Sequence, residues 1–210
     1  MMPGMTQPKP EAQSRHDSIE DVGRFFMGTS EVHIAADRLV KKLEELGIPY
    51  AICGALAVNA HGHHRTTDDI DVVLTSDGLE HFKERAIGLG WLDRFTGSRG
   101  VKDTERGVPI DFLLTGRLPG DGSDHGVRFP DPADCAIEHQ GKRYVALGKL
   151  IELKIAAALT RPDRPRDFDD VIQLIRKNAL GEHFADALHP YVQPKYRELW
   201  GYSRLPTDEF

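Results

Sequence analysis

The chain has 210 residues, enough for one large domain or two small ones, and its 40% hydrophobic and 29% charged residues are typical of a globular protein. A formal net charge of −6 argues against a protein that binds DNA regardless of sequence, since such proteins are usually basic. Cys53 and Cys135 lack the spacing of a metal motif, and no apolar run is long enough to cross a membrane. These features predict a cytoplasmic protein.

The elements of the first part of the chain follow from apolar periodicity and from turn residues. Residues 1–17 are rich in Pro and Gln and are predicted to form a flexible tail, with no signal peptide. The elements predicted after it are, in order, helices at 18–28 and 29–48, a strand at 49–54, a helix at 55–62, a strand at 69–75, a helix at 76–90, and strands at 108–114 and 142–147.

The last third of the chain changes character. Residues 148–161 and 167–179 both have helical spacing, and two shorter helices are expected beyond them. The order of elements predicts an α/β (α+β) fold in which helices flank a mixed sheet. We expect an α/β domain at residues 18–146, with a helical region at 147–210 packed on it.

Two acids open the strand predicted at residues 69–75. Side chains alternate along a strand, so Asp69 and Asp71 should lie on one face, with Ile70 on the other. Two carboxylates this close repel each other unless a cation lies between them, and carboxylate oxygens suit Mg²⁺ or Mn²⁺. The alternative, an edge strand whose acids simply face water, is equally compatible with these two residues.

The surrounding residues favour the metal site. Gly54 follows a strand and precedes a helix, where a missing side chain lets a backbone amide approach a phosphate. Asp111 interrupts another apolar strand. Three carboxylates beside a phosphate-binding turn are what two-metal nucleotidyl transfer requires. We therefore expect Asp69, Asp71 and Asp111 to hold metal ions, with Asp111 also acting as base.

A second unusual pattern occurs in the helical region. Lys154 has only apolar neighbours on its face of the helix, where a charge is costly unless an anion meets it or its head reaches solvent. Asp167 falls within the apolar stripe of the next helix, where it would also suit an N-terminal cap. A contact between Lys154 and Asp167 accounts for both residues.

Two groups of residues resemble motifs of the DNA polymerase β-like nucleotidyltransferase superfamily. Gly54-Ala55 followed by Asp69-Ile70-Asp71 resembles its hG[G/S]…DhDh signature. The wider string is similar to AbiEii-type nucleotidyltransferases, including MenT-like toxins, at Gly54, Ala57, Gly62, Arg65, Thr67, Asp69 and Asp71. A later pattern of the same family is matched by Leu150, Lys154, Arg164, Arg166, Asp167, Asp170 and Leu174.

This resemblance implies an Mg²⁺-dependent nucleotidyltransferase that moves a nucleoside monophosphate from a nucleoside triphosphate to an acceptor. For MenT-like members the acceptor is tRNA, and the protein is the toxin of a pair with an antitoxin protein. Lys154 and Asp167 would then be catalytic residues, and Gly54, Ala55, Arg65, Thr67 and Lys154 would contact the nucleotide. Ala55 departs from the pattern, because Gly or Ser is usual there and a serine hydroxyl would bond a phosphate.

Other readings remain open. The chain could be a catalytically silent nucleotide- or protein-binding module on the same fold, or a nucleotidyltransferase that acts on a small molecule or a protein. His61, His63 and His64 lie close in sequence, but no fourth ligand accompanies them, so a zinc site is not expected.

Overall fold

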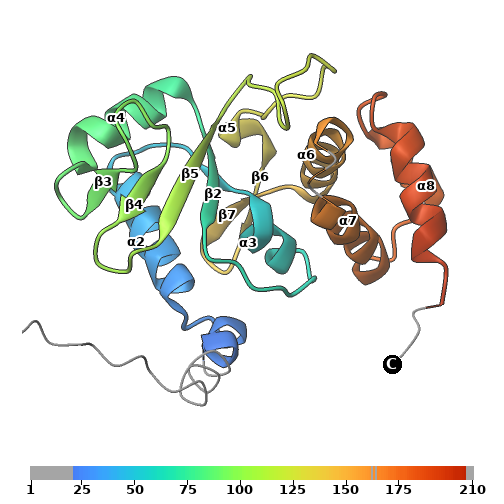
Figure 1. Cartoon of the computed structure of the whole chain (residues 1–210), viewed down its shortest axis with the longest axis horizontal. Helices are drawn as coiled ribbons and strands as arrows, with labels where there is room; N and C mark the ends of the chain where they lie inside the picture. Colours follow the sequence, from blue (N-terminus) through green and yellow to red (C-terminus); the bar gives the residue numbers. More distant parts are fainter. Residues whose placement is uncertain (1–20, 162, 164, 207–210) are drawn as a thin grey trace, which may run out of the picture.

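The computed structural model describes residues 21–161, 163 and 165–206. Its centre is a seven-stranded mixed sheet of order β3-β4-β5-β2-β1-β7-β6 (Figure 1). The strands are β1 (Ala51–Ile52), β2 (Ile70–Leu74), β3 (Trp91–Asp93), β4 (Val101–Asp103), β5 (Pro109–Leu114), β6 (Ala136–His139) and β7 (Lys142–Val145). The helices are α2 (Glu31–Glu45), α3 (Gly54–Ala60), α4 (Ser76–Ala86), α5 (Pro132–Cys135), α6 (Leu147–Thr160), α7 (Pro165–Lys177), η1 (Glu182–Ala187, 3₁₀) and α8 (Gln193–Ser203).

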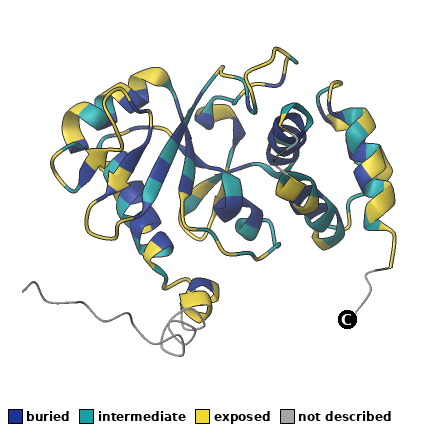
Figure 2. Ribbon diagram, in the orientation of Figure 1, coloured by how far each residue is buried: buried dark blue, intermediate teal, exposed yellow. Residues whose placement is uncertain are grey.

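Two apolar clusters cover the two faces of the sheet. One joins α2 and α4 to inward-facing residues such as Ile70, Val72 and Ile110. The other joins α6, α7 and α8 to residues such as Ala51, Val73 and Val145. Figure 1 shows α6, α7 and α8 side by side on one flank of the sheet, and Figure 2 shows α6 as the most deeply buried of the three. A central helix of this kind explains the nearly continuous apolar sequence of α6.

Strands β2 and β5 run parallel at the centre of the sheet and determine where the acids lie. Their register pairs Asp71 with Asp111. Ile70, Val72 and Ile110 point into the first apolar cluster, so the alternation of a strand turns both aspartates to the opposite face. Neighbouring strands lie about 4.8 Å apart, which brings the two carboxylates close together.

The sequence predicted the long elements better than the short ones. The helices predicted at 148–161 and 167–179 correspond to α6 and α7, whereas β3, β4 and β6 were not predicted. The helix cap predicted at Ser76 or Asp77 is wrong, because the Thr75 hydroxyl accepts the hydrogen bond from Gly78 N at 3.0 Å. Ser30 lies at the predicted start of α2, but its hydroxyl bonds the His33 ring at 2.8 Å rather than the backbone.

The architecture confirms the predicted mixed sheet flanked by helices, with helices at the C-terminal end. Strand β7 ends at Val145 and α6 begins at Leu147, while the division into a domain at 18–146 and a helical region at 147–210 stays a prediction. The predicted tail at 1–17 lies outside the described residues, as does Arg164. In the described part of the chain, every helix is too short or too polar to span a membrane.

Candidate active site

A cleft of about 770 Å³ opens between the sheet and the helices α6 and α7. One side is formed by the start of α3, by the loop before β2 and by β2 itself, and the other by α6 and α7. The predicted site residues that line it are Gly54, Ala55, Arg65, Thr67, Asp69, Asp71, Lys154 and Asp167. Residues more than a hundred positions apart in sequence therefore meet in one cavity.

Asp69 and Asp71 approach the cleft from different backbone settings. Asp71 is the second residue of β2, whereas Asp69 lies just before the strand begins and is exposed. The Thr67 hydroxyl donates a 2.5 Å hydrogen bond to Asp69 Oδ1. Thr67, predicted to contact the nucleotide, is therefore placed to orient the Asp69 carboxylate.

Asp111 lies beside the cleft rather than in its lining. Pro109 and Leu113, its neighbours on the same face of β5, are lining residues. Arg94 Nη1 donates to both oxygens of Asp111, at 2.8 and 2.9 Å, and both side chains are 42% exposed. Arg94 was not predicted as a site residue, because it directly follows the edge strand β3 and no motif surrounds it.

Gly54 is placed where any side chain would collide with Asp71. Its φ is +58°, in the left-handed region, and a Cβ atom there would lie 2.0 Å from Asp71 Oδ2. The preceding residue, Cys53, donates its backbone N–H to Asp71 O at 2.8 Å. Burial, with the Asp71 charge nearby, raises the pKa of the Cys53 thiol to about 12, so Cys53 is a neutral, apolar part of the wall.

On the helical side, the contact predicted between Lys154 and Asp167 is present. Lys154 Nζ lies 2.8 Å from Asp167 Oδ1 and 2.6 Å from Asp170 Oδ2. The Lys154 side chain is 7% exposed. Burial opposes its charged form, but the two carboxylates outweigh burial and raise the pKa of Lys154. Lys154 is therefore a charged ammonium in a buried setting.

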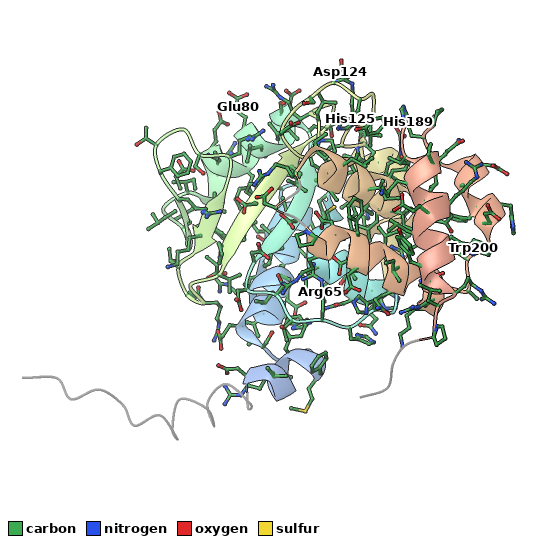
Figure 3. The ribbon with its side chains drawn as sticks, turned by 45° about the vertical axis from the view of Figure 1, so that its right-hand side comes forward. Arg65, Glu80, Asp124, His125, His189 and Trp200 are labelled. Atoms are coloured by element: carbon green, nitrogen blue, oxygen red, sulfur yellow. The ribbon has the colours of Figure 1, made fainter. Side chains whose placement is uncertain are left out.

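Asp170 is a residue of this site that helical periodicity did not mark. It matches a family position, yet it lies at the edge of its helix's apolar stripe and was not included among the site residues. In the fold it is fully buried and receives Arg65 through two hydrogen bonds, Nε to Oδ1 at 2.8 Å and Nη2 to Oδ2 at 3.0 Å (Figure 3 labels Arg65). Burial raises the pKa of Asp170, but Lys154 and Arg65 outweigh it and lower the pKa overall.

The histidines after α3 have structural contacts. His61 Nε2 lies 2.8 Å from Val145 O, and His63 Nε2 lies 3.9 Å from Asp170 Oδ1. Within residues 21–161, 163 and 165–206, no three His, Cys, Asp or Glu side chains are arranged so that they could hold a metal ion as they stand. Two of the expected metal ligands are hydrogen-bonded to other side chains, Asp111 to Arg94 and Asp69 to Thr67.

Comparisons with known proteins give similarity in structure but not in sequence. No family model and no curated protein sequence matches the chain. The chain is similar to the crystal structure of ANT(2″)-Ia in complex with adenylyl-2″-tobramycin, with 14% identity, a TM-score of 0.53, and coverage of 80% of this chain and 97% of that one. The solution structure of the antibiotic-resistance factor ANT(2″)-Ia has 18% identity, a TM-score of 0.50 and the same coverage of 80% and 97%.

A third structure, of a candidate nucleotidyltransferase from H. pylori, has 13% identity and a TM-score of 0.42, covering 93% of this chain and 84% of that one. These similarities do not show the AbiEii-type or MenT-like family, and that finer resemblance stays a prediction. The similarity to ANT(2″)-Ia, together with the mixed sheet and its C-terminal helices, shows that the chain has a nucleotidyltransferase-like fold.

Proposed function

We propose that this protein is a metal-dependent nucleotidyltransferase that moves a nucleoside monophosphate from a nucleoside triphosphate to an acceptor. The observation that carries the proposal is the pairing of Asp71 with Asp111 on parallel strands, beside a cleft whose opposite wall holds Lys154. Gly54 supports it, because its missing side chain leaves the room that Asp71 occupies. The nucleotidyltransferase-like fold agrees with this chemistry.

The donor chemistry of the acids suits Mg²⁺ or Mn²⁺. Carboxylate oxygens are the preferred ligands of both ions, and the paired positions of Asp71 and Asp111 bring two carboxylates together. Asp69 and Asp71 would hold two ions and Asp111 one of them, once Asp69 turns from Thr67 and Asp111 from Arg94. A bound ion supplies charge neutralisation of the triphosphate and Lewis-acid activation of the attacking hydroxyl.

The chain's own residues have separate tasks in this proposal. Asp111 accepts the proton of the acceptor hydroxyl as the hydroxyl oxygen bonds the α-phosphorus and pyrophosphate leaves. The backbone N–H groups at Gly54 and Ala55 bind phosphate oxygens, which needs no side chain and so tolerates Ala55. Lys154 binds the triphosphate, and Asp167, which shares the ammonium of Lys154, orients it. Arg65 lines the cleft but directs two of its nitrogens to Asp170, so its main task is to position the loop before β2.

The acceptor expected from the resemblance is tRNA, in a toxin that has an antitoxin partner. The charges of the cleft favour a second candidate, a cationic small molecule. The acids that line it are Asp68, Asp69, Asp71, Asp163 and Asp167, against the bases Arg65, Lys154 and Arg166. Asp68 and Asp163, to which this proposal assigns no metal ion, would attract a cationic acceptor. The ANT(2″)-Ia complex contains an adenylylated aminoglycoside, which is such a molecule.

The test is transfer of label from α-³²P-labelled ATP, CTP, GTP and UTP, with Mg²⁺, to bulk tRNA, an aminoglycoside mixture and protein. Wild type should label one acceptor class, and Asp71→Ala should reduce labelling at least about a thousandfold, since a metal ligand contributes several kcal/mol. Equal labelling by both proteins would remove the catalytic proposal. Metal-dependent binding of nucleotide without any transfer would favour the silent binding module. Labelling of tRNA that weakens steeply with salt would decide for RNA over the small cation.

A further inference from the structure

Asp170 connects the two sides of the cleft. It projects from α7, yet its carboxylate receives Arg65 from the loop before β2, 105 residues earlier in the chain, and Lys154 from α6. The Arg65 pair is bidentate, the geometry in which a guanidinium and a carboxylate fix each other's orientation best. Three segments that form the cleft therefore converge on one side chain, which is itself not part of the cleft lining.

Charge in this cluster is balanced internally. Arg65 and Lys154 supply two positive charges, and Asp167 and Asp170 supply two negative ones. His63 lies 3.9 Å from Asp170, but burial lowers its pKa, which favours the neutral ring at neutral pH. Removal of one charge from such a cluster leaves another buried without compensation, which is costly. An anion that enters the cleft would therefore disturb the charge balance of this cluster.

The two carboxylates on Lys154 differ in their access to that anion. The side chain of Asp167 is 15% exposed and lines the cleft, whereas that of Asp170 is fully buried behind it. A phosphate entering the cleft would compete for the Lys154 ammonium on the side of Asp167. Asp170 cannot be reached in this way, and Arg65 holds it in place through both oxygens.

We propose that Asp170 is a positioning residue that fixes the Lys154 ammonium and the Arg65 loop against each other, so that both keep their places when a triphosphate binds. This inference rests on the proposed function, because the anion in question is the nucleotide. In this proposal, Asp170 touches neither substrate nor metal. It acts through Lys154 on the triphosphate and through Arg65 on the loop that ends at Asp69.

The first test needs no nucleotide. Asp170→Asn keeps the shape of the side chain and removes its charge, and Asp169→Asn is the matched control, since Asp169 is the neighbouring, exposed residue of α7. Hydrogen exchange of residues 62–69 reports the link, with the Arg65 amide, which donates to Asn59 Oδ1 at 2.9 Å, as the main reporter. Asp170→Asn should exchange at least about ten times faster there than wild type or Asp169→Asn. Equal exchange in the three proteins would overturn the proposal.

The second test separates positioning from a merely structural role. In the folded Asp170→Asn protein, the KM for the nucleoside triphosphate should rise about tenfold or more, while kcat changes less than about threefold. A lower melting temperature with unchanged KM would overturn positioning and leave a structural role only. Should Asp170→Asn fail to fold, Arg65→Lys keeps the charge but loses the bidentate contact, and should show the faster exchange and a smaller rise in KM. Absence of transfer in wild type would count against the proposed function, while the exchange result would still decide the role of Asp170.

Discussion

The charged side chains on the two sides of the cleft differ in how exposed they are. On the sheet side, Asp69 lines the cleft and is exposed, and Asp111, which lies beside the cleft, is half exposed and paired with an equally exposed arginine. On the helical wall, Lys154 and Asp170 are buried and satisfied by each other and by Arg65 and Asp167. Exposed acids can exchange their partners for a metal ion at little cost, whereas buried ones cannot. The sheet wall is therefore suited to bind ligands, and the helical wall to hold its shape.

Among the changes that test this difference between the two walls, Gly54→Ala on the sheet wall should have the largest effect. The added Cβ, 2.0 Å from Asp71 Oδ2, must displace the carboxylate, and a misplacement of about 1 Å at a reacting centre costs about a hundredfold in rate. Nucleotide transfer should fall by that factor or more. Gly47→Ala is the control, since Gly47 has a similar φ of +65° but nothing within 4 Å of its Cβ position. Equal activity of the two variants would contradict the importance of this contact.

On the helical wall, Lys154→Met should lower the free energy of unfolding, which activity measurements do not report. Without the ammonium, Asp167 and Asp170 face each other in a buried setting, and breaking a buried ion pair costs about 3–5 kcal/mol. Urea unfolding measures this loss. Lys42→Met, which breaks the surface pair with Glu45, should cost less than about 1 kcal/mol.

A second change added to the first sharpens this result. Asp167→Asn combined with Lys154→Met should recover part of the lost stability, because it removes one of the two facing negative charges and leaves Asp170 paired with Arg65. A double variant less stable than Lys154→Met itself would show that repulsion between the carboxylates is not the cause.

Arg94→Ala should have a smaller effect, and it should increase the affinity for a metal ion. Removal of the guanidinium from Asp111 frees both carboxylate oxygens and removes a positive charge next to the expected metal site. Affinity for Mn²⁺, measured by calorimetric titration, should rise about three- to tenfold, with stability changed by less than about 1 kcal/mol. Arg128→Ala, which breaks the surface pair with Asp124, should leave the affinity unchanged. Weaker Mn²⁺ binding in Arg94→Ala would mean that Arg94 orients Asp111 for the ion.

The smallest effect should be a pH dependence of stability. Burial lowers the pKa of His63 below its ordinary value of 6.5, although Asp170 acts in the opposite direction. Protonation is then less favourable in the folded protein than in the unfolded one, so stability present above pH 6.5 is lost as pH falls through the folded pKa. Between pH 7 and pH 5, His63→Gln should lose less stability than wild type. His64 is the exposed neighbour of His63, and the control variant His64→Gln should lose the same stability as wild type over this pH range. A steeper loss in His63→Gln would show that the charged form of His63 is the stabilising one.

Local patterns in the sequence were enough for the long helices, for the central strands and for part of the site. Helical spacing predicted α6 and α7, and alternation around Ile70 and Ile110 predicted the face on which Asp71 and Asp111 lie. The contact of Lys154 with Asp167 was predictable for the same reason. A buried charge within an apolar stripe requires a partner, and the next helix offered one.

Tertiary structure decided the remainder, since those features depend on contacts between distant segments. Strands β3 and β4 have three residues each, too few for a period to be read, and are held by neighbours across the sheet. Arg94 reaches Asp111, and Arg65 reaches Asp170, only after the chain has folded. The sequence by itself therefore determined which acids and bases are available and on which face each lies. The fold determined their pairing, because an ion pair depends on distance in space rather than on spacing along the chain.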